Sequence, residues 1–131
     1  MEYLHENITN EIISAFYEVY NDLGYGFLEK VYENALINEL TSRSLFCEKQ
    51  KPIKVHYKDK IVGEYFADII VEKKIILELK ATEHLSEGHT YQLINYLKAT
   101  NIEIGLLLNF GKKPKVARKI FTNDRNKVGD L

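Results

Sequence analysis

The pattern of hydrophobic and polar residues changes its period along the chain and divides it into predicted helices and strands. Apolar residues recur every three or four positions over about 7–22 and again over about 28–43, a spacing typical of amphipathic helices. Gly24 and Gly26 separate the two segments and predict a break between them. The stripe that we expect the second helix to bury consists of Leu28, Val31, Tyr32, Ala35, Leu36 and Leu40.

A period of two replaces the helical period in the middle of the chain, which favours β-strands. Three strands are predicted, over residues 53–57, 61–71 and 75–80. Only short polar segments separate them, so we expect the three strands to form an antiparallel meander.

The last third of the chain predicts one more helix and two more strands. Ser86 is a suitable N-cap for a helix that reaches to about Thr100. Residues 102–110 are almost wholly apolar, as in a strand covered on both faces, and a short strand follows over about 116–121. The order α-α-β-β-β-α-β-β predicts an α+β (mixed α/β) domain built in layers.

Composition places the chain among soluble globular proteins. Its 131 residues, 45% hydrophobic and 28% charged, predict a single domain spanning 1–131. The single cysteine, Cys47, excludes an internal disulfide framework and a cysteine-rich zinc site. No apolar run approaches the ~20 residues that a membrane helix needs, and the start does not resemble a signal peptide. We therefore expect no membrane association and a cytoplasmic location.

Charge is unevenly distributed although the net charge is only −1. Residues 1–46 carry a net charge of −6, and residues 112–127 carry +6. The basic segment is interpreted either as a phosphate-binding patch or as a solvated edge, with a flexible basic tail expected from about residue 123.

Asp68 and Glu78 are the most informative pair of residues, because both lie inside strongly apolar predicted strands. A three-residue loop over 72–74 places Asp68 directly opposite Glu78, with Cβ atoms about 4.5–5.5 Å apart. The other face of the two strands is then entirely apolar. It consists of Ala67, Ile69, Val71, Ile75, Leu77 and Leu79.

Two opposed carboxylates repel each other, so a positive charge is expected between them. Lys80 lies on the same face, two residues after Glu78. One interpretation is an ion cluster of Asp68, Lys80 and Glu78 that only fixes the strand register. The other is a divalent cation, because paired carboxylate oxygens are ligands that Mg²⁺ or Mn²⁺ prefers.

Four motifs of this sequence resemble those of a known family. Asp68 followed by Glu78-Leu79-Lys80 resembles the D…(E/D)-x-K signature of the PD-(D/E)XK nuclease superfamily. Residues 26–32 read G-x-x-E-x-x-Y, similar to the motif that names the GxxExxY family within it. Residues 92–96 resemble the Q-x-x-x-Y motif of RecB-like nucleases, and 105–111 a late strand of that family. The resemblance spans about 10–122 and departs at Ala67, where the superfamily has its proline.

The resemblance implies a restriction-endonuclease-like fold, with a central mixed β-sheet flanked by helices, and metal-dependent cleavage of a phosphodiester bond. It assigns Asp68 and Glu78 as metal ligands. It makes Glu29 a further ligand, direct or through water, although a solvent-facing helix acid is the alternative. Lys80 would position or deprotonate the attacking water, or stabilise charge on the phosphate.

The remaining motif residues receive supporting roles by the same resemblance. Gln92 would donate a hydrogen bond to a phosphate or bond Lys80, and Tyr96, one helical turn later, would brace the site or simply pack in the core. Gly26 and Tyr32 complete the second motif as supporting residues.

The sequence leaves three functions in competition. The first is an Mg²⁺- or Mn²⁺-dependent nuclease that acts on nucleic acid, with DNA as the expected substrate. The second is a catalytically idle nuclease fold that binds nucleic acid or a protein partner. The third is a small structural protein whose buried charges set the strand register. In the nuclease interpretation, a homodimer or a protein partner would supply specificity.

Overall fold

A computed structural model describes residues 4–130 and confirms the predicted order of elements. The helices are α1 (Glu6–Leu23), α2 (Glu29–Ser42) and α3 (Glu87–Lys98), and the strands are β1 (Cys47–Tyr57), β2 (Lys60–Val71), β3 (Ile75–Lys80), β4 (Ile104–Phe110), β5 (Pro114–Ile120) and β6 (Gly129–Asp130). The short β6 is an addition to the prediction. Within the described range, no helix is both long and apolar enough to cross a membrane.

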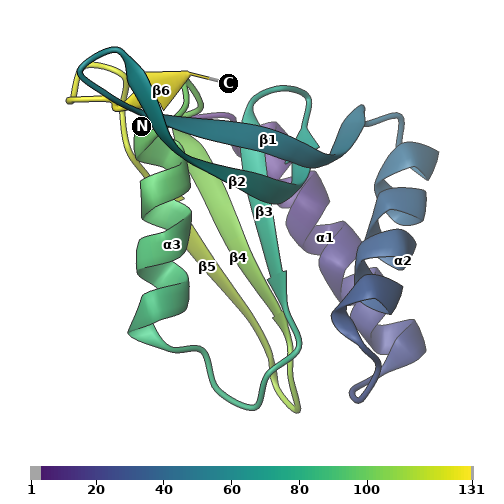
Figure 1. The fold of residues 1–131 in the computed structure, drawn as a ribbon. Coiled ribbons are helices and arrows are strands. Elements are labelled where there is room, and N and C mark those ends of the chain that lie inside the picture. Colours follow the sequence, from purple (N-terminus) through teal and green to yellow (C-terminus); the bar gives the residue numbers. More distant parts are fainter. Residues whose placement is uncertain (1–3, 131) are drawn as a thin grey trace.

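The strands form one mixed sheet in the order β5-β4-β3-β2-β1-β6. β3 and β4 are parallel, joined by a crossover through α3, and every other neighbouring pair is antiparallel. Helices α1 and α2 cover one face of the sheet, and α3 covers the other (Figure 1). The predicted α+β architecture, with helices flanking a central mixed sheet, is therefore confirmed.

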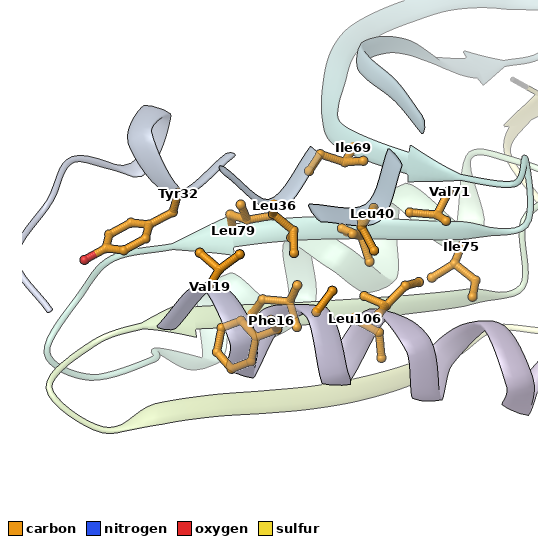
Figure 2. Close-up of a cluster of buried hydrophobic side chains, with 14 of the residues drawn as sticks. Phe16, Val19, Tyr32, Leu36, Leu40, Ile69, Val71, Ile75, Leu79 and Leu106 are labelled. Atoms are coloured by element: carbon orange, nitrogen blue, oxygen red, sulfur yellow. The ribbon is translucent and has the colours of Figure 1, made fainter. Parts of the chain in front are cut away.

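Two hydrophobic clusters hold the layers together. The larger joins α1 and α2 to the sheet, where Phe16, Leu36, Ile69 and Leu106 are completely buried (Figure 2). The smaller joins α3 to the opposite face. All seven residues of β4 are buried, since both clusters cover this strand, as its uniform apolar sequence predicts.

The predicted apolar stripe of α2 is wrong at its N-terminal end. Leu28 is 79% exposed and Val31 is 38% exposed, whereas Glu33 is buried. The helix begins at Glu29, so Leu28 belongs to the preceding turn. The buried face consists of Tyr32, Leu36 and Leu40, as predicted, together with Glu33, which the predicted stripe did not contain.

The turn between α1 and α2 is shaped by residues of the second motif. Gly26 has φ +118°, a conformation that side-chain-bearing residues rarely adopt. The Tyr32 hydroxyl donates a hydrogen bond to the carbonyl of Gly24 at 2.6 Å and accepts one from the N–H of Phe27 at 3.1 Å. The Tyr32 ring stacks on Phe110 with centroids 4.2 Å apart. Gly26 and Tyr32 therefore fix the start of α2, which carries Glu29.

The loop from β3 to α3 is fastened to the end of β4. The buried amide of Asn109 accepts a hydrogen bond from the N–H of Thr82 and donates one to its carbonyl, at 3.1 and 3.0 Å. A Cβ atom at Gly111 would lie 2.4 Å from the same carbonyl, so only glycine permits this approach. Ser86 then caps α3 through a capping box with His89, as its sequence predicts.

The C-terminal segment is bound to the domain rather than projecting as the expected tail. The Lys127 ammonium donates to the carbonyls of Leu97, Phe121 and Ile102 at 2.7–3.0 Å. β6 then pairs with β1 at the edge of the sheet. These contacts satisfy carbonyls at the end of α3 and around the start of β4, which gives the segment a structural role.

Candidate active site

Asp68 and Glu78 meet where the ladder between β2 and β3 ends. The loop between these strands has three residues, and the last backbone pair joins Ile69 to Leu77. At the next position along the two strands, backbone N–H groups donate hydrogen bonds to the two carboxylates instead of to the opposite strand. The N–H of Asp68 donates to Glu78 Oε1 at 3.2 Å, and the N–H of Leu79 donates to Asp68 Oδ2 at 2.9 Å.

Burial raises the pKa values of both carboxylates. Glu78 is 4% exposed, and this desolvation, reinforced by the charge of Asp68, raises its pKa to about 8. Desolvation also raises the pKa of Asp68, against the effect of its hydrogen bond from Leu79. Lys80 lowers both pKa values, the direction expected for a nearby cation, but burial outweighs its effect.

The predicted apolar face of β2 is interrupted at Asp68. Ile69 belongs to the cluster under α1 and α2, as expected, but Ala67 packs in the cluster under α3 together with Ile70. The register with β1 is unchanged at this level, but Gln50, which lies opposite Asp68, has a left-handed φ of 51° and is left out of the pairing. Asp68 therefore occupies a local irregularity in the strand, from which its carboxylate contacts both β3 and β1.

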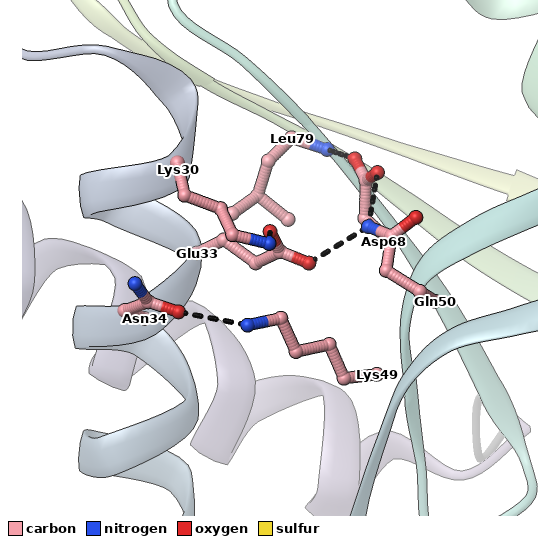
Figure 3. A network of polar contacts seen from close by, with 7 residues as sticks. All are labelled: Lys30, Glu33, Asn34, Lys49, Gln50, Asp68 and Leu79. Atoms are coloured by element: carbon pink, nitrogen blue, oxygen red, sulfur yellow. Dashed lines mark hydrogen bonds and ion pairs between the residues drawn. The ribbon is translucent and has the colours of Figure 1, made fainter.

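Two residues that the sequence analysis did not single out connect this acid pair to α2. Gln50 Nε2 donates to Glu33 Oε1 at 2.9 Å and lies 3.4 Å from Asp68 Oδ1 (Figure 3). Glu33 also forms an ion pair with Lys30 at 3.3 Å. The signal for Glu33 in the sequence was its spacing from Leu36 and Leu40, which places a carboxylate on the buried face of the helix.

Glu29 lies near the acid pair without joining it directly. It is exposed at the first position of α2, and its charge is the least of the influences that raise the pKa of Glu78. Within residues 4–130, no three His, Cys, Asp or Glu side chains converge as a group able to hold a metal ion. Asp68 and Glu78 thus supply a two-carboxylate site, with Glu29 at longer range.

Gln92 and Tyr96 lie on the α3 side of the same region. Gln92 donates its hydrogen bond to the Tyr96 hydroxyl at 3.0 Å rather than bonding Lys80. Tyr96 is 5% exposed, and burial together with the charges of Glu78 and Asp68 raises its pKa to about 12. The two residues of the Q-x-x-x-Y pattern therefore bond to each other, and Tyr96 lies close enough to the carboxylates for their charges to affect its pKa.

The sheet register places a row of polar residues beside the acids. Lys80 pairs with Asn109 of β4, and Asn109 pairs with Lys115 of β5. A pocket of about 400 Å³ opens next to this row. Its lining consists of Glu83, His84, Leu85, Asn109, Lys112, Lys113 and Lys115.

Only the first part of the basic segment contributes to this pocket. Lys112, Lys113 and Lys115 line it, whereas Arg125 lies over the ring of Phe121 at 4.2 Å and Lys127 is held by carbonyls. The charge excess of residues 112–127 is therefore divided between one lysine cluster and separate structural contacts.

The acid pair fits a divalent metal by its donor chemistry. Two carboxylates lie side by side with raised pKa values, and neither forms an ion pair with a cationic side chain in the described part of the chain. Each carboxylate has one oxygen that accepts a backbone N–H, which fixes its orientation. A hard cation with oxygen ligands and retained waters would remove the repulsion between them.

Comparisons with known proteins bear on the fold and on the family of this chain. The solved structure titled "Crystal structure of SSO0001" resembles this chain with a TM-score of 0.61 and 19% sequence identity, over 88% of this chain and 61% of that one. The chain therefore spans less than two thirds of that protein, and the likeness concerns the fold alone. The search of curated proteins found no match. A family model described as the PD-(D/E)XK nuclease superfamily matches residues 6–120, nearly the whole domain. The chain belongs to the PD-(D/E)XK nuclease superfamily.

Proposed function

We propose that this protein is a Mg²⁺- or Mn²⁺-dependent nuclease that hydrolyses phosphodiester bonds of DNA. The observation that supports it best is the pair of carboxylates, Asp68 and Glu78, oriented by backbone N–H groups and left without a cationic partner in the described chain. Lys80 follows on the same strand as Glu78. A structural ion cluster would instead place the lysine in contact with both acids.

The proposed roles follow from the chemistry of each side chain. Asp68 and Glu78 hold the metal, and the backbone carbonyl of Leu79 is a further candidate ligand. A bound Mg²⁺ would supply Lewis acidity and a water of lowered pKa. Lys80 orients or deprotonates the attacking water, or neutralises charge that develops on the phosphate.

The other polar residues position this pair. Gln50 and Glu33 limit the orientation of Asp68 from the α2 side, through the hydrogen bonds that join the three side chains. Gln92 holds the hydroxyl of Tyr96, a residue whose pKa is affected by the charges of both carboxylates. Glu29 completes the metal environment through water, consistent with its exposure and its longer-range influence on Glu78.

A cleavage assay tests the proposed function. Wild-type protein is incubated with single-stranded, duplex and branched DNA and with RNA, in Mg²⁺, in Mn²⁺ and in EDTA. We expect cleavage of DNA that requires the metal and is absent in the Asp68→Ala variant. Titration calorimetry with Mn²⁺ accompanies the assay, and binding to the wild type but not to Asp68→Ala is the expected result.

The same measurements separate the alternatives. An idle module would bind nucleic acid but leave every substrate intact in both metals. A purely structural acid cluster would give no Mn²⁺ binding above noise for the wild type or for Asp68→Ala. Either result contradicts the proposal.

The lysine pocket gives a separate prediction about DNA binding. Replacing Lys112, Lys113 and Lys115 together by glutamine should weaken binding and reduce the log–log salt slope by roughly one unit for each lysine that pairs with a phosphate in the wild type. The affinity is measured in EDTA over a range of salt concentrations. The matched control is glutamine at Lys73 and Lys74, which are exposed in the turn at the other end of β3. An unchanged slope in the triple variant would make this segment a solvated edge.

We also propose that the protein belongs to the GxxExxY branch of the superfamily, that it is cytoplasmic and that it has an additional partner. The G-x-x-E-x-x-Y pattern of residues 26–32 supports the branch, since Gly26 and Tyr32 shape the turn that presents Glu29. A homodimer or a protein partner is proposed as the source of sequence specificity.

A further inference from the structure

A second pocket lies on the α3 side of the acid pair and has no role in the chemistry proposed above. Its volume is about 550 Å³, in the usual range for sites that take small organic groups. Residues of β1, β2, α3 and the segment before β6 line it. They are Val55, Tyr65, Gly88, Gln92, Asn95, Tyr96, Lys98 and Val128.

Two tyrosine rings dominate the walls of this pocket. The rings of Tyr65 and Tyr96 have centroids 5.7 Å apart and are tilted by 43°. Tyr96 is 5% exposed and held by Gln92, whereas Tyr65 is 50% exposed. A fixed ring therefore lies beside one that presents an aromatic face to the pocket and the solvent, an arrangement suited to a flat aromatic guest.

Hydrogen-bonding groups surround the aromatic walls. Asn95 is exposed on α3, one residue before Tyr96, and its amide carries both donors and an acceptor. Gln92 retains its amide oxygen as an acceptor while its nitrogen bonds Tyr96. Planar amides can match the donor and acceptor edge of a nucleobase, so the pocket offers both a stacking surface and edge contacts.

One residue that lines the pocket, Tyr96, also lies near the strands that carry the acid pair. Tyr96 packs in one cluster with Ala67, the residue before Asp68, and with Ile76, two residues before Glu78. The charges of both carboxylates also raise the pKa of the Tyr96 hydroxyl. A phosphodiester held at the acids would therefore have a neighbouring base within reach of the pocket.

We propose that this pocket receives an unpaired nucleobase of single-stranded DNA, stacked on Tyr65, while the adjacent phosphodiester lies at Asp68 and Glu78. This inference rests on the proposed nuclease function and specifies its substrate. A base inside a duplex has both faces stacked on its neighbours, so it is not free to stack on Tyr65 in this pocket. The lining holds a single cation, Lys98, and stacking on aromatic residues is how single strands are bound without an extended basic surface.

Fluorescence binding measurements on the full chain in EDTA test the inference. The probes are a short single-stranded DNA carrying one 2-aminopurine, the same strand with an abasic site there, and the matched duplex. We expect the single strand to bind more tightly than the duplex and the 2-aminopurine emission to be quenched by stacking. Tyr65→Ala should weaken binding of the single strand by about 5- to 150-fold, the range for loss of one stacked base.

Two matched variants make the result specific. Tyr65→Phe keeps the ring and should retain both the affinity and the quenching. Tyr57→Ala removes a tyrosine that is 61% exposed on the same hairpin but outside the pocket, and it should bind like the wild type. Equal affinity for abasic and intact strands, or a Tyr65→Ala variant that binds like the wild type, would overturn the inference.

Failure of this inference is distinguishable from failure of the nuclease function. Binding is measured without metal, whereas cleavage is scored separately in Mg²⁺ with the wild type. Cleavage that depends neither on the base nor on Tyr65 would contradict the pocket proposal and support the nuclease function. Base-dependent binding without cleavage in any metal retains the pocket and removes the nuclease.

Discussion

Replacing Lys80 by alanine is expected to reduce DNA cleavage by about a thousandfold or more, while Mn²⁺ binding remains measurable. Asp68 and Glu78 keep their mutual orientation without the lysine, because backbone N–H groups hold them. The ammonium that the variant lacks is the nearest candidate for activating water or neutralising the phosphate. Its positive charge lowers the pKa values of both acids by disfavouring a proton there, and it disfavours a divalent cation in the same way, so metal affinity should stay unchanged or rise modestly in the variant.

Three variants are measured beside the wild type to test this prediction: Lys80→Ala, Asp68→Ala and Lys74→Ala. Asp68→Ala should lose both metal binding and cleavage, since it removes a proposed ligand. Lys74→Ala, which changes an exposed lysine just before β3, should behave as the wild type. Cleavage near the wild-type rate in Lys80→Ala, in a preparation where Asp68→Ala is inactive, would show that the role assigned to this lysine is wrong.

Gln92→Ala should have a smaller effect than Lys80→Ala, with a loss of about one to two orders of magnitude in cleavage. The structure gives a physical reason. Gln92 bonds the Tyr96 hydroxyl, so its loss would free a tyrosine within electrostatic range of the carboxylates without removing a charge or a ligand. If positioning is the mechanism, Tyr96→Phe should reproduce much of the loss, and Mn²⁺ affinity should stay unchanged in both variants.

Local patterns were sufficient to predict the order of the main elements and the meeting of the two acids, although β1 begins at Cys47 rather than at 53 and β6 was not predicted. The three-residue loop between β2 and β3 fixes which residues face each other, and the observed pairs from Val71–Ile75 to Ile69–Leu77 follow from it. Hydrophobic periodicity likewise predicted each helix within a few residues. Such features depend on neighbours in the sequence, which is why they can be read without the fold.

Features that depend on long-range contacts were not predictable in the same way. Gln50 joins Glu33 to Asp68 only because β1 is irregular at that level, and nothing in the local sequence marks a left-handed residue there. In the sequence Lys127 is one of several basic residues in the segment 112–127, but in the fold its ammonium donates hydrogen bonds to three carbonyls. In each case a polar side chain supplies hydrogen bonds that the distant backbone or a buried acid requires.

The metal-free protein should become less stable as the pH rises, and Glu78→Gln should remove most of that loss. Burial raises the pKa of Glu78 from its ordinary value of 4.5 to about 8, so the folded state binds this proton more tightly than the unfolded state. The stabilisation is complete below about pH 4.5 and is lost progressively up to about pH 8. Each pKa unit corresponds to about 1.4 kcal/mol, so the difference is on the order of 5 kcal/mol.

Denaturant unfolding in EDTA, from pH 5 to pH 9, measures this effect. Near pH 5 the wild type and Glu78→Gln should have similar free energies of unfolding, because Glu78 is protonated in the folded wild type. At pH 9 the variant should be more stable by a few kcal/mol, since its neutral amide is buried without a charge. Glu64→Gln, which changes an exposed acid of β2, is the matched control and should follow the wild type at every pH.

Adding Mn²⁺ should reverse the order of the two proteins at high pH. The metal binds the ionised carboxylates of the folded state, so it stabilises the wild type in proportion to RT ln(1 + [Mn²⁺]/Kd), whereas Glu78→Gln has lost a ligand. A variant that unfolds more easily than the wild type at pH 9 in EDTA would contradict this account. That outcome would mean that the ionised carboxylate stabilises the fold, which is the behaviour of a structural ion cluster rather than of a metal site.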